Sequence, residues 1–173
     1  MIETERTLLK PIKLKDAQEV FSYRSDAVTN AYQGWIPKTL DEVTAFIAKN
    51  PKEYNQLGTW FQLTILEKNT NTVIGDIGVH FIDQHQSEIG CTLAKQYHGK
   101  GFATEALHQV IHHLFHDLNK HRIVTSIDPQ NINSIKLVER LGFRKEAHIK
   151  KSILMNGKWV DDIVYAILKE EWS

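Results

Sequence analysis

The sequence contains very little cysteine and no excess of charge of either sign. Its single cysteine, Cys91, can form neither an internal disulfide nor a cysteine-rich zinc site, and it suits a reducing compartment. The chain carries 21 Lys and Arg residues and 21 Asp and Glu residues, whereas nonspecific nucleic-acid binding depends on a positive excess. We therefore expect no nucleic-acid partner.

Long apolar runs are also absent. No stretch approaches the roughly 18 apolar residues that a membrane-spanning helix needs. Residues 1–6 lack the apolar core of a secretory signal. These absences predict a cytoplasmic protein without a membrane partner.

The composition that remains is that of an ordinary folded protein, with 42% hydrophobic and 24% charged residues. A length of 173 residues fits one domain, at roughly 150 residues per domain. No linker, repeat or low-complexity tract divides the chain. We predict a single domain over residues 1–173, large enough to fold without disulfides or metal.

Hydrophobic periodicity predicts a mixed α/β domain in the order β-α-α-β-β-β-α-β-α-β-β. Strands are expected at Thr7–Ile12, Trp60–Glu67, Thr72–Ile82, Ser87–Leu93, Arg122–Ile127, Glu146–Leu154 and Trp159–Leu168. Helices are expected at Lys15–Tyr23, from Thr39 onward, at Phe102–Leu118, and from Asn131 or Asn133 to Leu141. Asn156-Gly157 predicts the turn of a terminal hairpin.

The segment from Ile89 to Ala106 carries the most chemical information. It is predicted to run from a strand through a loop with Gly99 and Gly101 into a strongly amphipathic helix. Two glycines at the mouth of a helix let successive N–H groups point into one concavity, and the helix N-terminus adds about half a positive charge. The segment therefore predicts a phosphate or pyrophosphate site, although the same glycines also fit a simple tight turn.

Two other phosphate-binding patterns do not fit this loop. A P-loop requires Ser or Thr after its Gly-Lys pair, but here Gly101 follows Lys100. A dinucleotide fingerprint requires a third small residue, where Thr104 stands, and an acid about 20 residues further on. Asp128 lies 24 residues past Thr104 and precedes a proline, which is a poor match.

A second informative element lies about 30 residues downstream, from Asn131 to Phe143. A capped helix carries Ser134 in its first turn and ends at Gly142-Phe143. Taken alone, this element is a helix cap and a helix stop.

Together the two elements resemble the GNAT superfamily of N-acetyltransferases, and the similarity extends over nearly the whole chain. The acetyl-CoA loop of that family, [Gln/Arg]-x-x-Gly-x-[Gly/Ala], fits two registers, Gln96 to Gly101 or His98 to Ala103. We prefer the second register, because it sets Ala103 at the small position and keeps Leu93 on the strand whose backbone pairs with pantetheine. In that register His98 replaces the usual Gln or Arg.

The resemblance implies a mixed, mostly antiparallel sheet flanked by helices, with acetyl-CoA as cosubstrate at the mouth of the central helix. Backbone N–H groups supply most of the phosphate binding in this family, so His98 is a tolerable departure. The residues that the resemblance assigns to acetyl-CoA are Leu93, His98, Gly99, Lys100, Gly101, Phe102, Ala103, Thr104, Asn131 and Ser134.

Within the superfamily, the chain is similar to the RimJ/RimL branch, which contains ribosomal-protein N-terminal acetyltransferases. The matching segments are Glu88-Ile89-Gly90, residues 99–106, Asn131-x-x-Ser134, residues 5–10 and residues 156–161. The branch includes many members of unknown substrate, so the acceptor does not follow from this similarity.

The resemblance also implies direct transfer of acetyl to an amine. Many members place a tyrosine acid seven residues after the motif asparagine, where this chain has Val138. The RimJ/RimL pattern offers Ser134 instead, whose hydroxyl can hydrogen-bond the leaving sulfur. As general base we select Glu88, on the acceptor-strand side; an α-amine with a pKa of about 7.7–8.0 needs only weak help.

Three histidines, His108, His112 and His116, follow helical spacing and resemble zinc ligands in pairs. They lie opposite the apolar stripe of their helix, and no nearby acid or cysteine completes a set. We interpret them as a solvated helix face and expect no metal.

Other tempting residues also have plain structural explanations. Cys91 has no His or Asp partner placed by the sequence, so we interpret it as a small strand residue. Tyr32, Trp35 and Trp60 fit either the lining of an acceptor pocket or ordinary core packing.

The sequence thus predicts an acetyl-CoA-dependent N-acetyltransferase, monomeric or homodimeric, that acetylates a primary amine, with a protein or peptide N-terminus as the preferred acceptor. One alternative is a small-molecule enzyme acting on a polyamine or aminoglycoside, although the chain shows no clear acidic cluster for such cations. The other is a non-catalytic acyl-CoA-binding module, which would not need Ser134.

Overall fold

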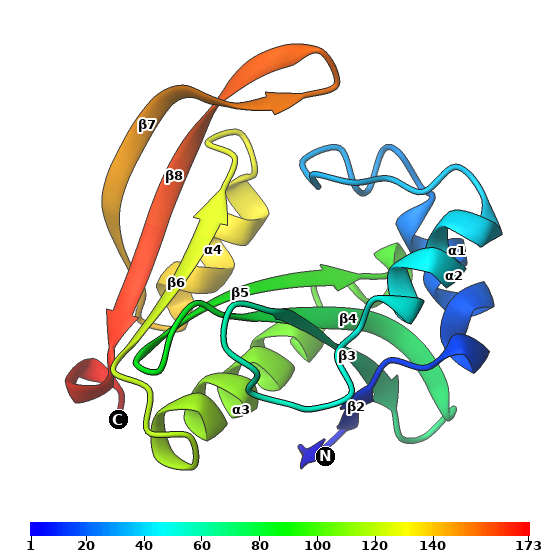
Figure 1. Cartoon of the computed structure of the whole chain (residues 1–173), viewed down its shortest axis with the longest axis horizontal. Coiled ribbons are helices and arrows are strands. Elements are labelled where there is room, and N and C mark those ends of the chain that lie inside the picture. Colours follow the sequence, from blue (N-terminus) through cyan, green and yellow to red (C-terminus); the bar gives the residue numbers. More distant parts are fainter.

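The computed structural model describes residues 1–173, which form one open sheet of eight strands with helices on both of its faces (Figure 1). The strands lie in the order β1-β2-β3-β4-β5-β6-β8-β7, and only β5 and β6 are parallel neighbours. The strands are β1 (Ile2–Glu3), β2 (Thr7–Pro11), β3 (Trp60–Glu67), β4 (Thr72–Phe81), β5 (Gln86–Leu93), β6 (Arg122–Ile127), β7 (Arg144–Met155) and β8 (Lys158–Leu168). The predicted mixed, mostly antiparallel architecture is confirmed.

The α-helices are α1 (Ala17–Arg24), α2 (Leu40–Ala48), α3 (Phe102–His116) and α4 (Ile132–Arg140). Short 3₁₀ turns cover Leu14–Asp16, Lys95–Tyr97 and Lys169–Glu171. No helix combines the length and the apolar composition needed to cross a membrane.

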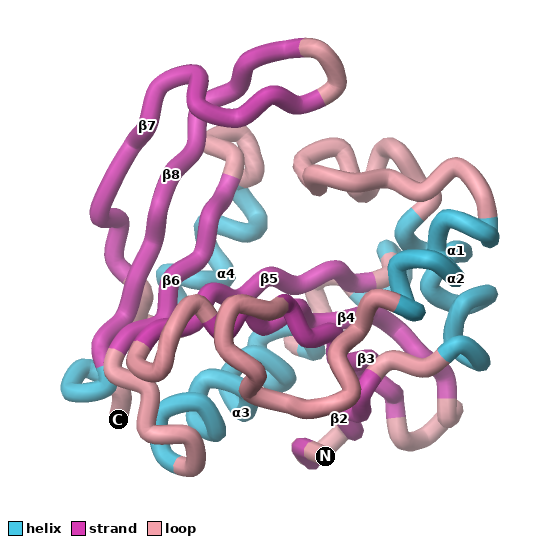
Figure 2. Tube along the Cα trace, viewed as in Figure 1, coloured by secondary structure: helices cyan, strands magenta, loops and turns pink.

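Helix α3 covers one face of the sheet and connects the parallel strands β5 and β6 (Figure 2). Its apolar residues recur at helical spacing, so one side of it is buried against the strands. The buried residues are Phe102, Ala106, Leu107, Val110, Ile111, Leu114 and Phe115. They belong to a core of 26 buried residues that reaches across the sheet from β1 to β8. This core fixes the N-terminus of α3 at the end of β5.

Helices α1 and α2 cover part of the opposite face, over a smaller core of eight buried residues. A buried polar network ties α1 to β4. The Asp76 carboxylate, 1% exposed, accepts hydrogen bonds from Arg24 Nη2 at 2.6 Å, Arg24 Nε at 3.0 Å and the Tyr23 hydroxyl at 2.5 Å. Removing one partner would leave a buried charge uncompensated, which costs about 3–5 kcal/mol.

Strands β5 and β6 pair over only three residue pairs, Gln86 with Arg122, Ser87 with Ile123 and Glu88 with Val124. Beyond them β5 continues to Leu93 and β6 continues to Ile127, each paired only with its other neighbour. The two strands therefore diverge and leave an opening in the sheet after Glu88, which we call the β5–β6 opening.

Most predicted element boundaries agree with the structure within two residues, and those of β3 and β6 agree fully. Asn131, rather than Asn133, caps α4, because its side-chain oxygen accepts the Ser134 N–H at 3.3 Å. Thr39 caps α2 by accepting the Glu42 N–H at 3.2 Å. Thr39 and Glu42 have the spacing of a capping box, but the box is only half formed, because the Glu42 carboxylate accepts the Lys38 N–H instead of the Thr39 N–H.

Candidate active site

The loop between β5 and α3 presents a row of backbone donors. Gly99 (φ 71°) and Gly101 (φ 84°) adopt the left-handed conformation that glycine alone enters without strain. All six N–H groups from residue 99 to residue 104 lack a hydrogen-bond partner in the protein. Consecutive free N–H groups at the N-terminus of a 15-residue helix form an anion site. The loop therefore fits a phosphate or pyrophosphate group.

Arg6, from the segment between β1 and β2, contacts this loop and the first turn of α3. Its Nη1 donates to the Lys100 carbonyl at 2.9 Å, and its Nε donates to Glu105 at 2.7 Å. Its guanidinium also lies over the Phe102 ring, 4.2 Å from the centroid. A Cβ added at Gly101 would lie 3.2 Å from Arg6 Nη2. The N-terminal segment thus holds the first turn of α3 in place.

His98 connects the start of the loop to the end of β5. Its Nε2 lies 2.8 Å from the Leu93 carbonyl oxygen, so the ring donates a hydrogen bond to that carbonyl. Leu93 itself is 9% exposed and packs in the main core. The structure thus brings together His98 and Leu93, two residues that the family resemblance assigns to acetyl-CoA. The His98 ring already makes a hydrogen bond within the protein.

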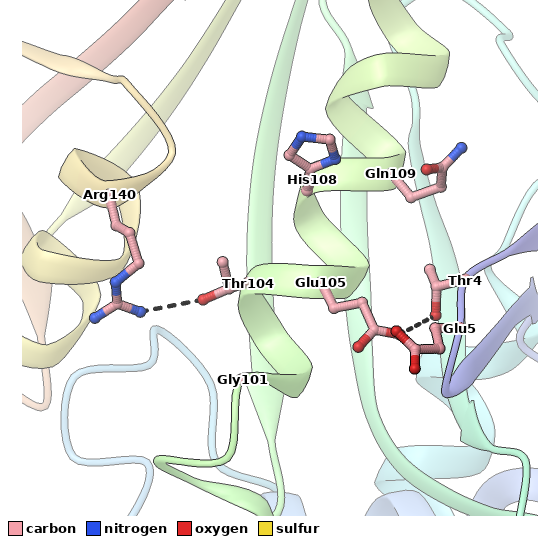
Figure 3. Close-up of a pocket in the computed structure, with 8 residues that line it drawn as sticks. All are labelled: Thr4, Glu5, Gly101, Thr104, Glu105, His108, Gln109 and Arg140. Atoms are coloured by element: carbon pink, nitrogen blue, oxygen red, sulfur yellow. Dashed lines mark hydrogen bonds between the residues drawn. The ribbon is translucent and has the colours of Figure 1, made fainter.

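A pocket of about 500 Å³ lies beside the first turns of α3 (Figure 3). Its lining residues are Thr4, Glu5, Gly101, Thr104, Glu105, His108, Gln109 and Arg140. Arg140, in the last turn of α4, donates from Nη1 to the Thr104 hydroxyl at 3.1 Å. This contact brings a cation from α4 next to the mouth of α3.

The β5–β6 opening is lined on the β5 side by a glycine. Gly90 is exposed, and a Cβ added there would meet no atom within 4 Å. Glycine inside a strand is unfavourable unless another group must approach the backbone closely. The space above Gly90 is therefore open to a ligand.

Glu88 lies where the β5–β6 opening begins, in the last residue pair that joins the two strands. Its carboxylate Oε2 is 3.5 Å from His80 Nδ1 on β4, and 27% of its side chain is exposed. The His80 ring stacks on Trp60 of β3, with 4.9 Å between the centroids and 12° between the planes. These three residues lie directly opposite one another on one sheet face, the face away from α3.

Ser134 lies in the first turn of α4, one turn before the buried residue Val138. Its N–H is bound by Asn131, while its hydroxyl makes no hydrogen bond within the protein. The hydroxyl is thus available to a ligand, and the cap that stabilises the helix is Asn131.

Burial raises the pKa of the Cys91 thiol to about 12. The thiol is therefore protonated near neutral pH, and the thiolate form that reacts as a nucleophile is scarce. This environment supports the interpretation of Cys91 as a packing residue.

The three histidines at helical spacing, His108, His112 and His116, are all exposed, as the helical pattern predicts. His108 packs near Trp172, with 4.8 Å between ring centroids. Trp35 packs on Phe46 of α2, whereas Trp60 remains 44% exposed on the sheet face that also carries Glu88.

Sequence reasoning missed Arg6, His80 and Arg140. Arg6 contacts residues more than 90 positions away, so no local pattern reveals it. His80 and Glu88 become neighbours only through the register of two antiparallel strands. A basic residue in the last turn of a helix, such as Arg140, ordinarily only complements the helix dipole.

The chain is similar to proteins of one family, in sequence and in fold. Residues 6–144 match the family model described as "Acetyltransferase (GNAT) domain". The chain is 41% identical over 178 residues to a probable N-acetyltransferase, YjcK, of Bacillus subtilis (strain 168), covering 99% of this chain and 98% of that protein. It is 32% identical over 176 residues to an uncharacterized N-acetyltransferase, YnaD, of the same organism, covering 99% of both.

Relatives with named substrates are more distant. The chain is 27% identical over 124 residues to the [ribosomal protein uS5]-alanine N-acetyltransferase of Escherichia coli (strain K12), covering 70% of this chain and 64% of that protein. A solved spermidine N-acetyltransferase from Vibrio cholerae, in complex with CoA and spermine, superposes with a TM-score of 0.82 at 20% identity, over 96% of this chain and 97% of that chain.

The crystal structure of a GNAT-family acetyltransferase from Bacillus anthracis superposes on this fold with a TM-score of 0.89. The two chains are 30% identical, and the superposition covers 98% of this chain and 99% of that chain. The free N–H groups of residues 99–104, which we call the donor loop, and the β5–β6 opening agree with the family model and with these relatives. The chain belongs to the GNAT family of N-acetyltransferases.

Proposed function

We propose that this N-acetyltransferase moves the acetyl group of acetyl-CoA directly to a primary amine, and that its preferred acceptor is a protein or peptide N-terminus. The observation that carries the cosubstrate assignment is the run of six unpartnered N–H groups, residues 99–104, beside the β5–β6 opening. The free N–H groups can bind the diphosphate of acetyl-CoA, which needs many hydrogen-bond donors. The β5–β6 opening leaves room for the arm that carries the thioester.

We assign the binding of the diphosphate to the backbone of Gly99, Lys100, Gly101, Phe102, Ala103 and Thr104, in the register that begins at His98. Leu93 and the rest of the splayed end of β5 would lie along the pantetheine arm. Asn131 would hold the first turn of α4 so that Ser134 faces the thioester. Arg140 adds a cation at the edge of the loop through Thr104.

Two side chains supply the acid–base chemistry in this proposal. The Ser134 hydroxyl, free of any partner in the protein, donates a hydrogen bond to the departing thiolate sulfur. A thiol with a pKa of about 8.5 is a fair leaving group, so a hydroxyl donor suffices. The Glu88 carboxylate takes the proton that the acceptor ammonium must lose before its nitrogen attacks.

The charge of the acceptor side favours a single amine over a polycation. On the sheet face that carries Glu88, strands β4 and β5 present one other carboxylate, Asp76, which Arg24 already neutralises. A polyamine carries several positive charges and gains from several carboxylates. The named relative that acts on a ribosomal-protein alanine is consistent with an α-amine acceptor.

The whole chain is proposed to act as one domain in the cytoplasm, as a monomer or homodimer. The main core of 26 residues includes buried side chains from every strand except β7. A single cysteine suits a reducing compartment.

The deciding experiment measures thiol release from acetyl-CoA against a panel of N-terminal peptides, polyamines and aminoglycosides. We expect turnover with peptides and little with polycations. Turnover with spermidine alone would replace the proposed acceptor. Tight acetyl-CoA binding by calorimetry without turnover on any amine would identify a non-catalytic acyl-CoA-binding protein.

A further inference from the structure

His80 is a partly exposed side chain with one buried polar atom, and the proposed reaction assigns it no role. Its Nδ1 atom is shielded from solvent and has no hydrogen-bond partner within the protein. Unpartnered buried polar atoms are rare in native proteins, and each calls for an explanation. The one charged group near this atom is the Glu88 carboxylate, with Oε2 at 3.5 Å.

The His80 ring is held in a fixed orientation. Trp60 stacks on it nearly in parallel, at 4.9 Å between centroids. The register places Trp60, His80 and Glu88 side by side on β3, β4 and β5. The ring therefore has little freedom to turn Nδ1 away from Glu88.

Glu88, in contrast, has room to move. Its side chain is 27% exposed, and Gly90, the next residue on the same face of β5, adds no side chain to restrain it. A carboxylate in such a position has several rotamers, of which only some keep it beside the β5–β6 opening. A hydrogen-bond donor held in a fixed position beside the carboxylate would favour one of these rotamers.

We propose that His80 is a positioning residue for Glu88: the Nδ1–H group, held by the Trp60 stack, donates to the Glu88 carboxylate and holds it at the start of the β5–β6 opening. The separation of 3.5 Å is long for a hydrogen bond, and catalytic contacts commonly shorten when substrate binds. The inference rests on the proposed role of Glu88 as base. It adds that the base depends on a histidine of the neighbouring strand β4, outside every motif that the sequence assigns to ligand binding.

Two substitutions at position 80 separate positioning from packing. His80→Phe keeps an aromatic ring on Trp60 but removes the donor, and His80→Asn keeps a donor near the place of Nδ1. We expect His80→Phe to lower kcat at least about tenfold, a part of the roughly 10²–10⁴-fold that acid–base assistance contributes. His80→Asn should restore most of that loss. The KM for acetyl-CoA should stay unchanged in both, because His80 lies opposite Glu88, at the end of β4 away from Gly75 and its partner Leu93, where the donor loop begins.

Combination with Glu88→Gln tests whether His80 acts through Glu88. If it does, Glu88→Gln with His80→Phe should be no slower than Glu88→Gln alone, since coupled residues are not additive. His85→Asn, at an exposed histidine of the β4–β5 turn, is the matched control and should keep normal kcat.

Equal kcat losses in His80→Phe and His80→Asn, or additive losses with Glu88→Gln, would overturn the positioning role while leaving the base assignment intact. Normal kcat in Glu88→Gln would instead remove the base assignment, and the role of His80 with it.

Discussion

Gly99 offers the sharpest test of the donor loop. A Cβ added at Gly99 would meet no atom of the protein within 4 Å, whereas one added at Gly101 would press on Arg6. Gly99→Ala therefore leaves the packing of the loop unchanged and places a methyl group in the open space next to the free N–H groups. If phosphate occupies that space, the methyl group must displace it.

The expected magnitudes separate strain from binding. Gly99 has a φ of 71°, and an L-residue in this conformation costs roughly 1–2 kcal/mol. For a chain of this size, that loss lowers Tm by about 2–8 °C. Each lost hydrogen bond to a charged phosphate is worth about 1.5–3 kcal/mol. The loss of one such bond raises the Kd for acetyl-CoA by roughly 10–150-fold.

Gly58 supplies a matched control. Its φ is 78°, and a Cβ added there also meets no atom within 4 Å, but it lies in the loop before β3. Gly58→Ala should lose as much thermal stability as Gly99→Ala and keep wild-type affinity. Calorimetric titration with acetyl-CoA, at a temperature well below both melting transitions, makes the comparison. An unchanged Kd in Gly99→Ala, or an equal loss in Gly58→Ala, would refute the placement of the phosphates.

Ser134→Ala should lower kcat about 100-fold, near the lower end of acid–base assistance. Its Tm should change little, because the side chain that caps α4 is that of Asn131. If steady-state kinetics show that the variant keeps more than half of its kcat, the leaving group has no identified donor. Replacing His108, His112 and His116 with glutamine should leave activity and Tm nearly unchanged, and a stoichiometric metal that survives dialysis only in the wild type would contradict this. Arg122 on β6 donates a hydrogen bond to Glu146, and this bond lowers the pKa of the Glu146 carboxyl. The pair therefore stabilises the fold fully above the unfolded pKa of about 4.3, and this stabilisation is lost as the pH falls through the lower pKa of the folded state. Glu146→Gln should thus lower Tm at pH 7, and melts near pH 2 should show no difference from the wild type.

Local patterns in the sequence were sufficient for most of the fold. Strands β3 and β6 are predicted to the residue, because each is a β-branched or aromatic run bounded by turn residues. Strand β1 escaped prediction because it has only two residues and exists through the pairing of Ile2 with Leu9. Helix α1 begins as a 3₁₀ turn at Leu14, a distinction that depends on packing rather than on residue preference.

The candidate site likewise combines features that local sequence predicts with contacts that it does not predict. Its loop and helix termini are local features, so Gly99, Gly101, Asn131 and Ser134 could be selected from spacing together with a family resemblance. The contacts that hold these features in place come from residues far apart in the chain. Arg6 reaches Glu105 across 99 positions, and such a contact follows only from the completed fold.

If acetyl-CoA binds as proposed, the short pairing of β5 with β6 links the stability of the protein to its supply of acyl donor. Unpaired strand edges inside a sheet invite local opening and pairing with other chains. With acetyl-CoA in the proposed position, the pantetheine arm would fill the β5–β6 opening, and bound ligand would add about 2.7 kcal/mol of stability at a concentration of 100 times Kd. A cell short of acetyl-CoA would then hold this enzyme in its less stable form, more open to proteolysis. Its cellular abundance would follow the acetyl-CoA pool without any dedicated regulatory site.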